Sequence, residues 1–433
     1  MTGDNSTGSA DVAEQHAHLE HPTVRGGMAL WTLFLGFAML MVGNGLNLAV
    51  LGVRVVDEGF GVRISGYVMA CYFAGFLLGP AVVVKLLSTV GHIRVFASLA
   101  SVASCAVLVH FIWISPISWA LMRFVFGFCM AGLYVVVESW LNDASTPRNR
   151  GRTLAVYMIV SMGGLAVGQL LIVTADPSGY LLFVVASILV SMSFVPIALA
   201  ATTDAPPVRL PDRLGLRELA RSAPTGLVGM FFTGASHGIL FGLGAVYATE
   251  AGFSARTTAL FIAVPSIGAL LFQWPIGWVS DHVPRRAVIF AVALAAVGVC
   301  VSLALTPQGN DGVVPMMLVL GGLTFPLYSL LLSHTLDRSA PGKAMGASGT
   351  LLRVNGTGAV LGPVVAASLM AALGETAIFW CLVGTHGLIA IYVAFRLVAE
   401  DALPMSLQGP FVPMPARATD FAIRLTSRLK REP

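Results

Sequence analysis

The stretch GLYVVVESWLNDASTP, residues 132–147, recurs as PLYSLLLSHTLDRSAP, residues 326–341, and this repeat decides the fold class. Six positions are identical: Leu133, Tyr134, Ser139, Asp143, Ser145 and Pro147 are matched by Leu327, Tyr328, Ser333, Asp337, Ser339 and Pro341. The offset of about 194 residues is close to half of the 433-residue chain, and it also places GGLAVG at 163–168 over TGAVLG at 357–362. Two homologous halves in an apolar chain predict two similar membrane bundles, with sites at the repeat interface near the bilayer midplane.

The composition is that of a membrane protein. The mean hydropathy is +0.83 and charged residues make up 11% of the chain, against about 25% in soluble domains. Apolar segments of about 20 residues, long enough to cross a hydrocarbon core of roughly 30 Å, recur along the whole chain. They predict twelve transmembrane helices, near residues 28–52, 64–86, 95–113, 117–138, 153–173, 180–202, 225–248, 257–279, 287–306, 313–335, 345–372 and 377–397. The predicted fold is therefore an all-α integral membrane protein with twelve transmembrane helices in two pseudo-symmetric six-helix bundles.

Polar segments divide the chain around these spans. The first residues are polar and acidic and lack the basic region and apolar core of a signal peptide, which predicts a disordered tail. The central connection is rich in proline and arginine, and LGLRELARSA from Leu214 is expected to form a short amphipathic helix on the inner leaflet. The predicted organisation is a disordered cytoplasmic tail (1–26), a first bundle (27–202), a cytoplasmic linker (203–224), a second bundle (225–398) and an irregular cytoplasmic C-terminal tail (399–433).

Basic residues are distributed unevenly between the predicted loops, and this sets the orientation in the membrane. With a cytoplasmic N-terminus, the only basic residues in the outer loops are Arg54, Arg63 and Arg256. The other basic residues of the loops lie on the inner side. Both termini are therefore expected in the cytoplasm. The formal net charge of +4 reflects this asymmetry and does not support nucleic-acid binding, which would require a basic soluble domain.

The most specific local motif closes the eighth predicted span. Gly277, Asp281, Arg285 and Arg286 form the pattern G-x-x-x-D-x-x-x-R-R, whereas the corresponding loop of the first half has Ser88 where the aspartate would stand. With twelve spans in two repeats, the pattern resembles the loop signature of the major facilitator superfamily. The stretches VGHIRVFA, ESWLND and RGR, with the tail motif FVPMP, look like the bacterial YcaD-type branch of that superfamily. The resemblance implies a transporter of the bacterial inner membrane that works by alternating access, with a cavity lined by spans 1, 4, 7 and 10.

The resemblance also implies a gate at the inner ends of the helices. In the family the aspartate faces a helix N-terminus, whose partial positive charge favours an anion, and the arginines hold nearby carboxylates. Asp337 is then the expected partner of Arg285 or Arg286, and the repeat makes Asp143 the expected partner of Arg94. The alternative is that the arginines only anchor the helices at the inner interface. The recurrence of both aspartates at the repeat offset favours the gate.

Ionisable residues inside the spans are expensive in lipid and usually face a partner or a cavity. The fourth span carries a stripe of polar and small residues within an arc of about 80°, formed by Arg123, Gly127, Ala131, Tyr134 and Glu138. Arg123 followed by Gly127 is similar to the R-x-x-x-G pattern of proton-coupled antiporters, in which the arginine influences proton release from a nearby acid. Span 1 has Asn44 and Asn47 in place of such an acid. A structural arginine bonded to Gln169, Asn44 or backbone carbonyls is therefore the alternative.

Three further residues have competing interpretations. Glu138, at the inner edge of its span, is a candidate proton-coupling site, a gate residue or an interfacial carboxylate. Arg353 is a candidate for binding an anionic substrate or for locking the inner gate to Glu138, and the alternative is a side chain that snorkels to the interface. His237 is the repeat counterpart of Asn44 and the second proton-coupling candidate, with an ordinary hydrogen-bonding role as the alternative.

The expected substrate cavity is mostly apolar. Its polar points are Asn44, Asn47, Arg123, Tyr134, His237 and Tyr328. Such a lining suits a small amphipathic organic molecule, neutral or anionic, and export is favoured over import. We expect a monomer whose partners are this solute and the lipid bilayer. The rivals are an uncoupled facilitator and a receptor or scaffold that has the fold without transport.

Enzyme patterns are not found in the sequence. It has no Walker A loop, no G-x-S-x-G elbow and no paired His/Glu metal spacing on a predicted span. No CxxC spacing exists either, and the five cysteines all fall inside predicted spans. The sequence therefore predicts a protein that is not an enzyme and has neither cofactor nor metal.

Overall fold

The computed structural model describes residues 8–146, 149–200, 214–306, 312–340, 343–400 and 403–414, and among these the side chains of all but residues 8–29, 200, 344 and 345. Twelve helices in this part of the chain are long and apolar enough to cross a membrane, and each covers one of the twelve predicted segments. The helices are α1 (Gly8–Asp57), α2 (Val62–Val90), α3 (His92–Ile112), α4 (Pro116–Ala144), α5 (Arg150–Leu170), α6 (Leu181–Met192), α7 (Phe194–Ala200), α8 (Leu216–Ser222), α9 (Pro224–Glu250), α10 (Ala255–His282), α11 (Arg285–Leu305), α12 (Val313–Arg338), α13 (Ala344–Leu373) and α14 (Ala377–Ala399). Short 3₁₀ helices follow α5 (η1, Leu171–Thr174) and α14 (η2, Met405–Leu407).

Short connections separate the spans, and local chemistry explains where the helices stop. Gly91 has a φ of 89°, a left-handed conformation that glycine adopts without strain, and it forms the whole turn between α2 and α3. Gly374, with a φ of 95°, ends α13 in the same way. At the start of α10, the hydroxyl of Ser254 accepts a hydrogen bond of 3.2 Å from the backbone amide of Thr257, which caps the helix.

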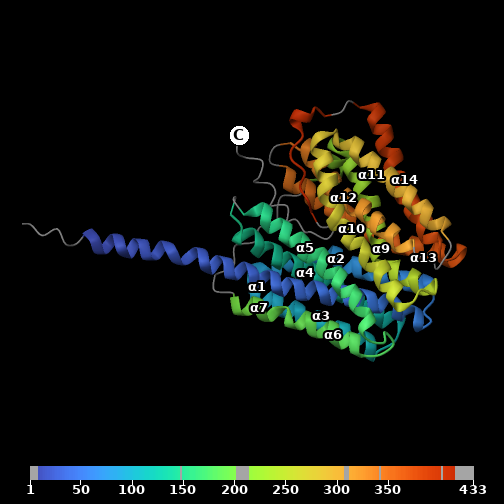
Figure 1. Ribbon diagram of the computed structural model, residues 1–433, viewed down its shortest axis with the longest axis horizontal. Coiled ribbons are helices and arrows are strands. Elements are labelled where there is room, and N and C mark those ends of the chain that lie inside the picture. Colours follow the sequence, from blue (N-terminus) through green and yellow to red (C-terminus); the bar gives the residue numbers. More distant parts are fainter. Residues whose placement is uncertain are drawn as a thin grey trace, which may run out of the picture.

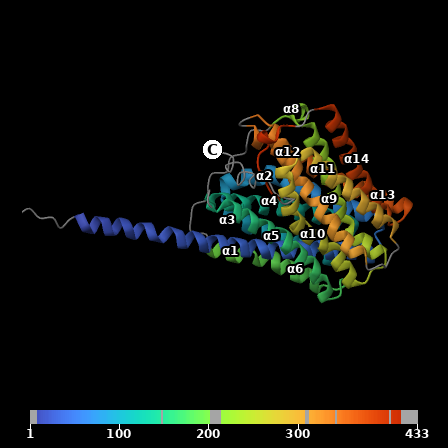
Figure 2. The same cartoon turned by 45° about the horizontal axis from the view of Figure 1, so that its top comes forward.

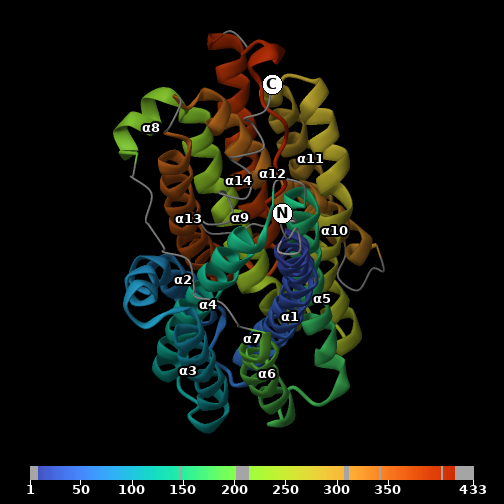
Figure 3. The same cartoon turned by 90° about the vertical axis from the view of Figure 1, so that its left-hand side faces the viewer.

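The helices form two bundles that follow the sequence repeat. In Figure 1 the first half, α1 to α7, is drawn in blue to green and lies below the second half, α9 to α14, in yellow to red. Figure 3 shows the same two bundles from the side at which α1 enters. The halves meet where α2 packs on α13, α5 on α10 and α1 on α9. This arrangement confirms the predicted fold class.

The two ends of the bundle differ, and we name them by their residues. The basic end carries Arg94, Arg150, Arg285 and Arg338, and the opposite end carries the turns at 58–61 and 251–254. The glycines that approach the other half closely lie at mid-depth or nearer the opposite end. A Cβ atom on Gly66 of α2 would lie 2.9 Å from the carbonyl oxygen of Pro363 of α13, and one on Gly52 of α1 would lie 2.5 Å from Cβ of Ala245 of α9. The halves are therefore joined tightly in the part of the bundle away from the basic end.

The N-terminal segment differs from the expectation. Residues 8–26 were expected to be disordered, but in the structure they continue α1 as helix beyond the bundle (Figure 2). Helix formation is costly at nucleation and inexpensive in propagation. The spanning part of α1 supplies the nucleus, and GSADVAEQHAHLEH is rich in good helix formers.

The predicted linker and tail both pack on the second half where the structure describes them. Residues 203–213 lie outside the described residues. The amphipathic segment forms α8, whose Leu219 is completely buried, and Lys343 forms an ion pair of 2.5 Å with Glu218 of this helix. Residues 403–414 of the tail also lie against the second half, through hydrogen bonds to Asp281 and Asp337.

Candidate functional site

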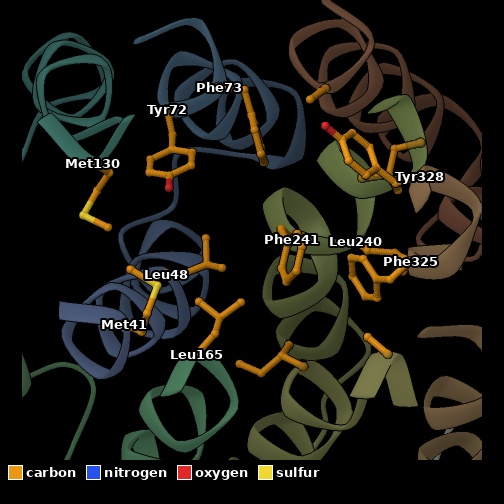
Figure 4. Packing of buried hydrophobic residues seen from close by; sticks show 14 of the residues in the cluster. Met41, Leu48, Tyr72, Phe73, Met130, Leu165, Leu240, Phe241, Phe325 and Tyr328 are labelled. Carbon is orange, nitrogen blue, oxygen red and sulfur yellow. The ribbon is translucent and has the colours of Figure 1, made fainter. Parts of the chain in front are cut away.

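The six residues predicted to line a cavity are all buried at the core of the two bundles. Their exposed fractions are at most 4%, and they are Asn44 and Asn47 of α1, Arg123 and Tyr134 of α4, His237 of α9 and Tyr328 of α12. Figure 4 shows buried apolar side chains from both halves, with Met41 and Leu165 on one side and Phe241 and Phe325 on the other. The surroundings are thus aromatic and aliphatic, with a few polar groups.

The guanidinium of Arg123 lies over an aromatic ring. Its central carbon is 4.7 Å from the ring centroid of Tyr72 on α2, a cation–π contact. Gly127, one turn further along α4, allows this approach because a Cβ there would collide with the backbone of Tyr72. Of the partners named for a structural Arg123, Gln169 is not bonded, since its Oε1 atom has no hydrogen-bond partner among the described residues. The close packing of α4 on α2 directs the arginine to the tyrosine instead.

Glu138 lies in an aromatic enclosure at the other end of the same stripe. Its Oε1 accepts a hydrogen bond of 2.5 Å from the phenol of Tyr157 on α5, and both side chains are completely buried. Phe37 of α1 stacks on Tyr157 at 5.2 Å and meets Tyr134 edge-on at 5.5 Å. The hydroxyl of Tyr134 in turn donates to the sulfur of Met41, at 3.0 Å. An interfacial carboxylate would be exposed, so this burial removes that interpretation.

Tyr157 is a site residue that the sequence did not indicate. It is 19 residues from Glu138 and lies on a different helix, so no helical spacing in the sequence relates the two residues. Its helix, α5, packs on α10 of the second half. The partner of the carboxylate thus belongs to a helix that borders the other half of the protein.

His237 lies near the middle of α9 in the second half. Its ring stacks on Phe325 of α12 with centroids 4.9 Å apart and planes inclined by 22°. One turn earlier on α9, the hydroxyl of Thr233 is buried with no hydrogen-bond partner among the described residues. The histidine therefore belongs to the α9–α12 contact that borders the interface.

Several buried amide groups have no protein partner in the described part of the chain. They are the Nδ2 atom of Asn44, both amide atoms of Asn47 and the Oε1 atom of Gln169. A buried polar atom without a hydrogen bond costs about 1–3 kcal/mol. These groups are consequently available to bond water or a polar group of a solute.

The loop motif forms a charge cluster at the basic end. Arg285 pairs with Asp337, as expected, and its second amino group lies 3.6 Å from Asp281. Arg286 donates to the carbonyl of Arg396 at 2.7 Å and lies 3.6 Å from Glu400. The expected contact between Arg285 and Asp337 is present, and it joins α11 to α12 within the second half. Its role as a gate stays a prediction.

The counterpart in the first half is not formed. Arg94 and Asp143 are both exposed, and the described residues contain no ion pair between them. Ser88 stands where the second half has Asp281, so this loop lacks one of the two carboxylates that hold the arginine in its counterpart. The lock of the inner gate between Arg353 and Glu138 stays a prediction. Arg353 has an exposed side chain, whereas Glu138 is completely buried.

Known proteins share this sequence pattern and architecture. The family model described as Major Facilitator Superfamily matches residues 33–354. The chain belongs to this superfamily. An uncharacterized MFS-type transporter, YcaD of Escherichia fergusonii, is 30% identical over 355 residues, which cover 79% of this chain and 88% of the relative. An MFS-type transporter of Enterobacter sp. strain 638 is 29% identical over 351 residues, with the same coverage.

Solved structures agree with the fold of the transporter. The nucleoside transporter NupG superposes with a TM-score of 0.69 at 13% identity, covering 86% of this chain and 98% of that protein. A bacterial homologue of the human lysosomal transporter Spinster gives 0.65 at 14% identity, covering 95% and 98%. At such identities the likeness concerns the fold alone. The protein is thus a multi-pass membrane transporter of the superfamily, and its described residues contain no group of three or more His, Cys, Asp or Glu placed to hold a metal.

Proposed function

We propose that the protein is a secondary active transporter of the bacterial inner membrane that moves a small organic solute by alternating access, coupled to protons through Glu138. It acts as a monomer with both termini in the cytoplasm, and export is the favoured direction. Support comes from the two homologous halves, from the polar groups buried where they meet, and from the arginines gathered at the basic end.

The observation that carries the coupling is the hydrogen bond between Tyr157 and Glu138. An acid inside a membrane span is costly, and together with its named partner it is by default a candidate functional site. The Tyr157 phenol is a donor suited to the charged carboxylate. When Glu138 takes up a proton, the charge disappears and the short bond loses its charge-assisted character. The protonation state is thereby linked to the contact between α4 and α5, next to Tyr134 and Tyr328.

The surroundings support an amphipathic solute. Aromatic and sulfur-containing side chains, among them Phe73, Met130 and Phe241 (Figure 4), supply apolar contact. The amides of Asn44 and Asn47 supply donors and acceptors, and Arg123 is the one positive group of the stripe. A neutral or anionic organic molecule fits this combination better than a cation does.

The test uses purified protein in proteoliposomes and a panel of labelled amphipathic solutes. Uptake driven by an imposed pH gradient is compared with exchange of solute at equal pH on both sides. Glu138→Gln is expected to abolish gradient-driven uptake and to retain exchange. The matched control is Glu250→Gln, which changes an exposed carboxylate at the end of α9 and leaves both activities intact. Undiminished gradient-driven uptake by Glu138→Gln would refute coupling through Glu138. Exchange without any gradient-driven uptake in the wild type would make the protein an uncoupled facilitator.

A further inference from the structure

Residues 403–414, which we call the C-terminal strap, lie along the second half and form hydrogen bonds with two of its helices. Four backbone amides of the strap donate to side chains of α10 and α12: Gly409 to Asp337 (2.9 Å), Phe411 to Asp281 (2.7 Å), Val412 to Ser333 (3.4 Å) and Met414 to Ser329 (2.9 Å). Ser329 also donates to the carbonyl of Met414 and accepts from Gln273 of α10. The backbone is therefore held at four points by two different helices.

The strap also reaches well into the bundle. Met414 is 1% and Val412 8% exposed, so its end is buried. Ser329 precedes the end of α12 at Arg338 by nine residues, which is about 13 Å of helix. The ring of Phe411 lies on Gly277, where an added Cβ would be 2.6 Å from its Cε1 atom. The glycine of the loop motif thus makes room for the strap in this protein.

The strap forms hydrogen bonds with the charged residues at the end of α10 and their partners. Arg285 pairs with Asp337 and Asp281, and it also donates to the carbonyl oxygen of Gly409 at 2.8 Å. The two carboxylates each accept a strap amide as well. In the first half the corresponding Arg94 and Asp143 are exposed and not paired with each other. In the second half, the charged residues of the predicted gate are therefore bonded to one another and to the strap. In the first half, Arg94 and Asp143 do not pair with each other.

We propose that the strap is a latch that stabilises the conformation in which the basic ends of the two halves stand apart. This inference rests on the alternating-access function proposed above. Closing the basic end requires α10 to approach the first half there, and α10 is the helix that packs on α5. The strap covers Gly277 and Asp281 on this helix and supplies the bonds that partners from the first half would otherwise make. A ligand that binds one state better than the other shifts the equilibrium toward that state.

The experiment measures the distance between the basic ends, and it needs no substrate. Spin labels are placed at Arg152→Cys on α5 and His282→Cys on α10, two exposed positions, in a background without the five native cysteines. Double electron–electron resonance spectroscopy then gives the distribution of distances between the two labels, for the full chain and for a chain ending at residue 402. Gly277→Leu expels Phe411 in the full-length chain, and Gly298→Leu is its control because a Cβ at Gly298 meets nothing within 4 Å.

We expect a long distance in the full chain and in Gly298→Leu. Deletion of the strap and Gly277→Leu are each expected to raise the ratio of short to long distances about tenfold, a coupling of the usual size. A shortened chain that elutes as a monodisperse peak and keeps the wild-type distribution would overturn the latch. Should the shortened chain fail to fold, Gly277→Leu decides in the same way. Failure of the wild-type protein to transport any solute of the panel in proteoliposomes, together with the expected distance change, would refute the proposed transport and leave the latch standing.

Discussion

The phenol of Tyr157 donates a hydrogen bond of 2.5 Å to the carboxylate of Glu138, and both side chains are completely buried between α4 and α5. This pair links the one acidic residue of the α4 stripe to a helix of the same half that also packs on α10 of the other half. In the proposed alternating-access mechanism, a change in the charge of Glu138 therefore acts at a helix that borders the other half.

Tyr157→Phe removes the donor and keeps the ring that stacks on Phe37. A hydrogen bond to a charged group contributes about 1.5–3 kcal/mol, so gradient-driven transport is expected to fall at least tenfold while solute exchange changes little. The matched control is Tyr180→Phe, since Tyr180 is an exposed tyrosine at the opposite end. Equal losses of exchange and gradient-driven transport would assign Tyr157 to packing.

Arg123 and Tyr72 are expected to couple energetically. A buried cation–π contact contributes about 1–2 kcal/mol, and a double-mutant cycle with Arg123→Met and Tyr72→Leu isolates it from the packing that each change also removes. The measurement is the thermal stability of the purified protein in detergent. A coupling near zero would show that the guanidinium is held by other groups.

Asp337→Asn is expected to destabilise the protein strongly. The change removes the buried carboxylate partner of Arg285 and leaves only the more exposed Asp281 at 3.6 Å, and breaking one side of a buried ion pair typically costs about 3–5 kcal/mol. Asp143→Asn is its repeat-related control, because Asp143 is exposed and makes no ion pair with Arg94. There the free energy of unfolding should stay within about 0.5 kcal/mol. Equal effects of the two substitutions would contradict the asymmetry between the halves.

Orientation is tested by fusions to a periplasmic reporter enzyme. Alkaline phosphatase joined at Gly215, before α8, is expected to be inactive, because the basic end faces the cytoplasm in our proposal. Fusions at Gly252 and Gly374, in turns at the opposite end, are expected to be active. Activity at Gly215 would invert the whole topology.

Part of the candidate site could be predicted from the sequence because it depends on local patterns. The partnership of Arg285 and Asp337 follows from a loop motif and from the recurrence of the aspartate at the repeat offset, and the structure contains this ion pair. The helical spacing of Arg123 and Glu138 predicts a stripe that faces a partner or a cavity, and in the structure both side chains are buried. The same repeat led to the expectation of an Arg94–Asp143 pair, which is absent, because only the second half has Asp281 and the strap beside its arginine.

By itself the sequence determined the twelve spans, the two halves and the membrane environment. Each is a consequence of local composition, since any segment of about 20 apolar residues must satisfy its backbone hydrogen bonds as a helix in lipid. Tertiary structure alone decided that Tyr157 meets Glu138, that Arg123 lies over Tyr72 and that Phe411 rests on Gly277. These contacts join residues on different helices or in the tail, with no periodic relation in the chain. They depend on how closely the helices approach one another, which is set by packing across the whole bundle.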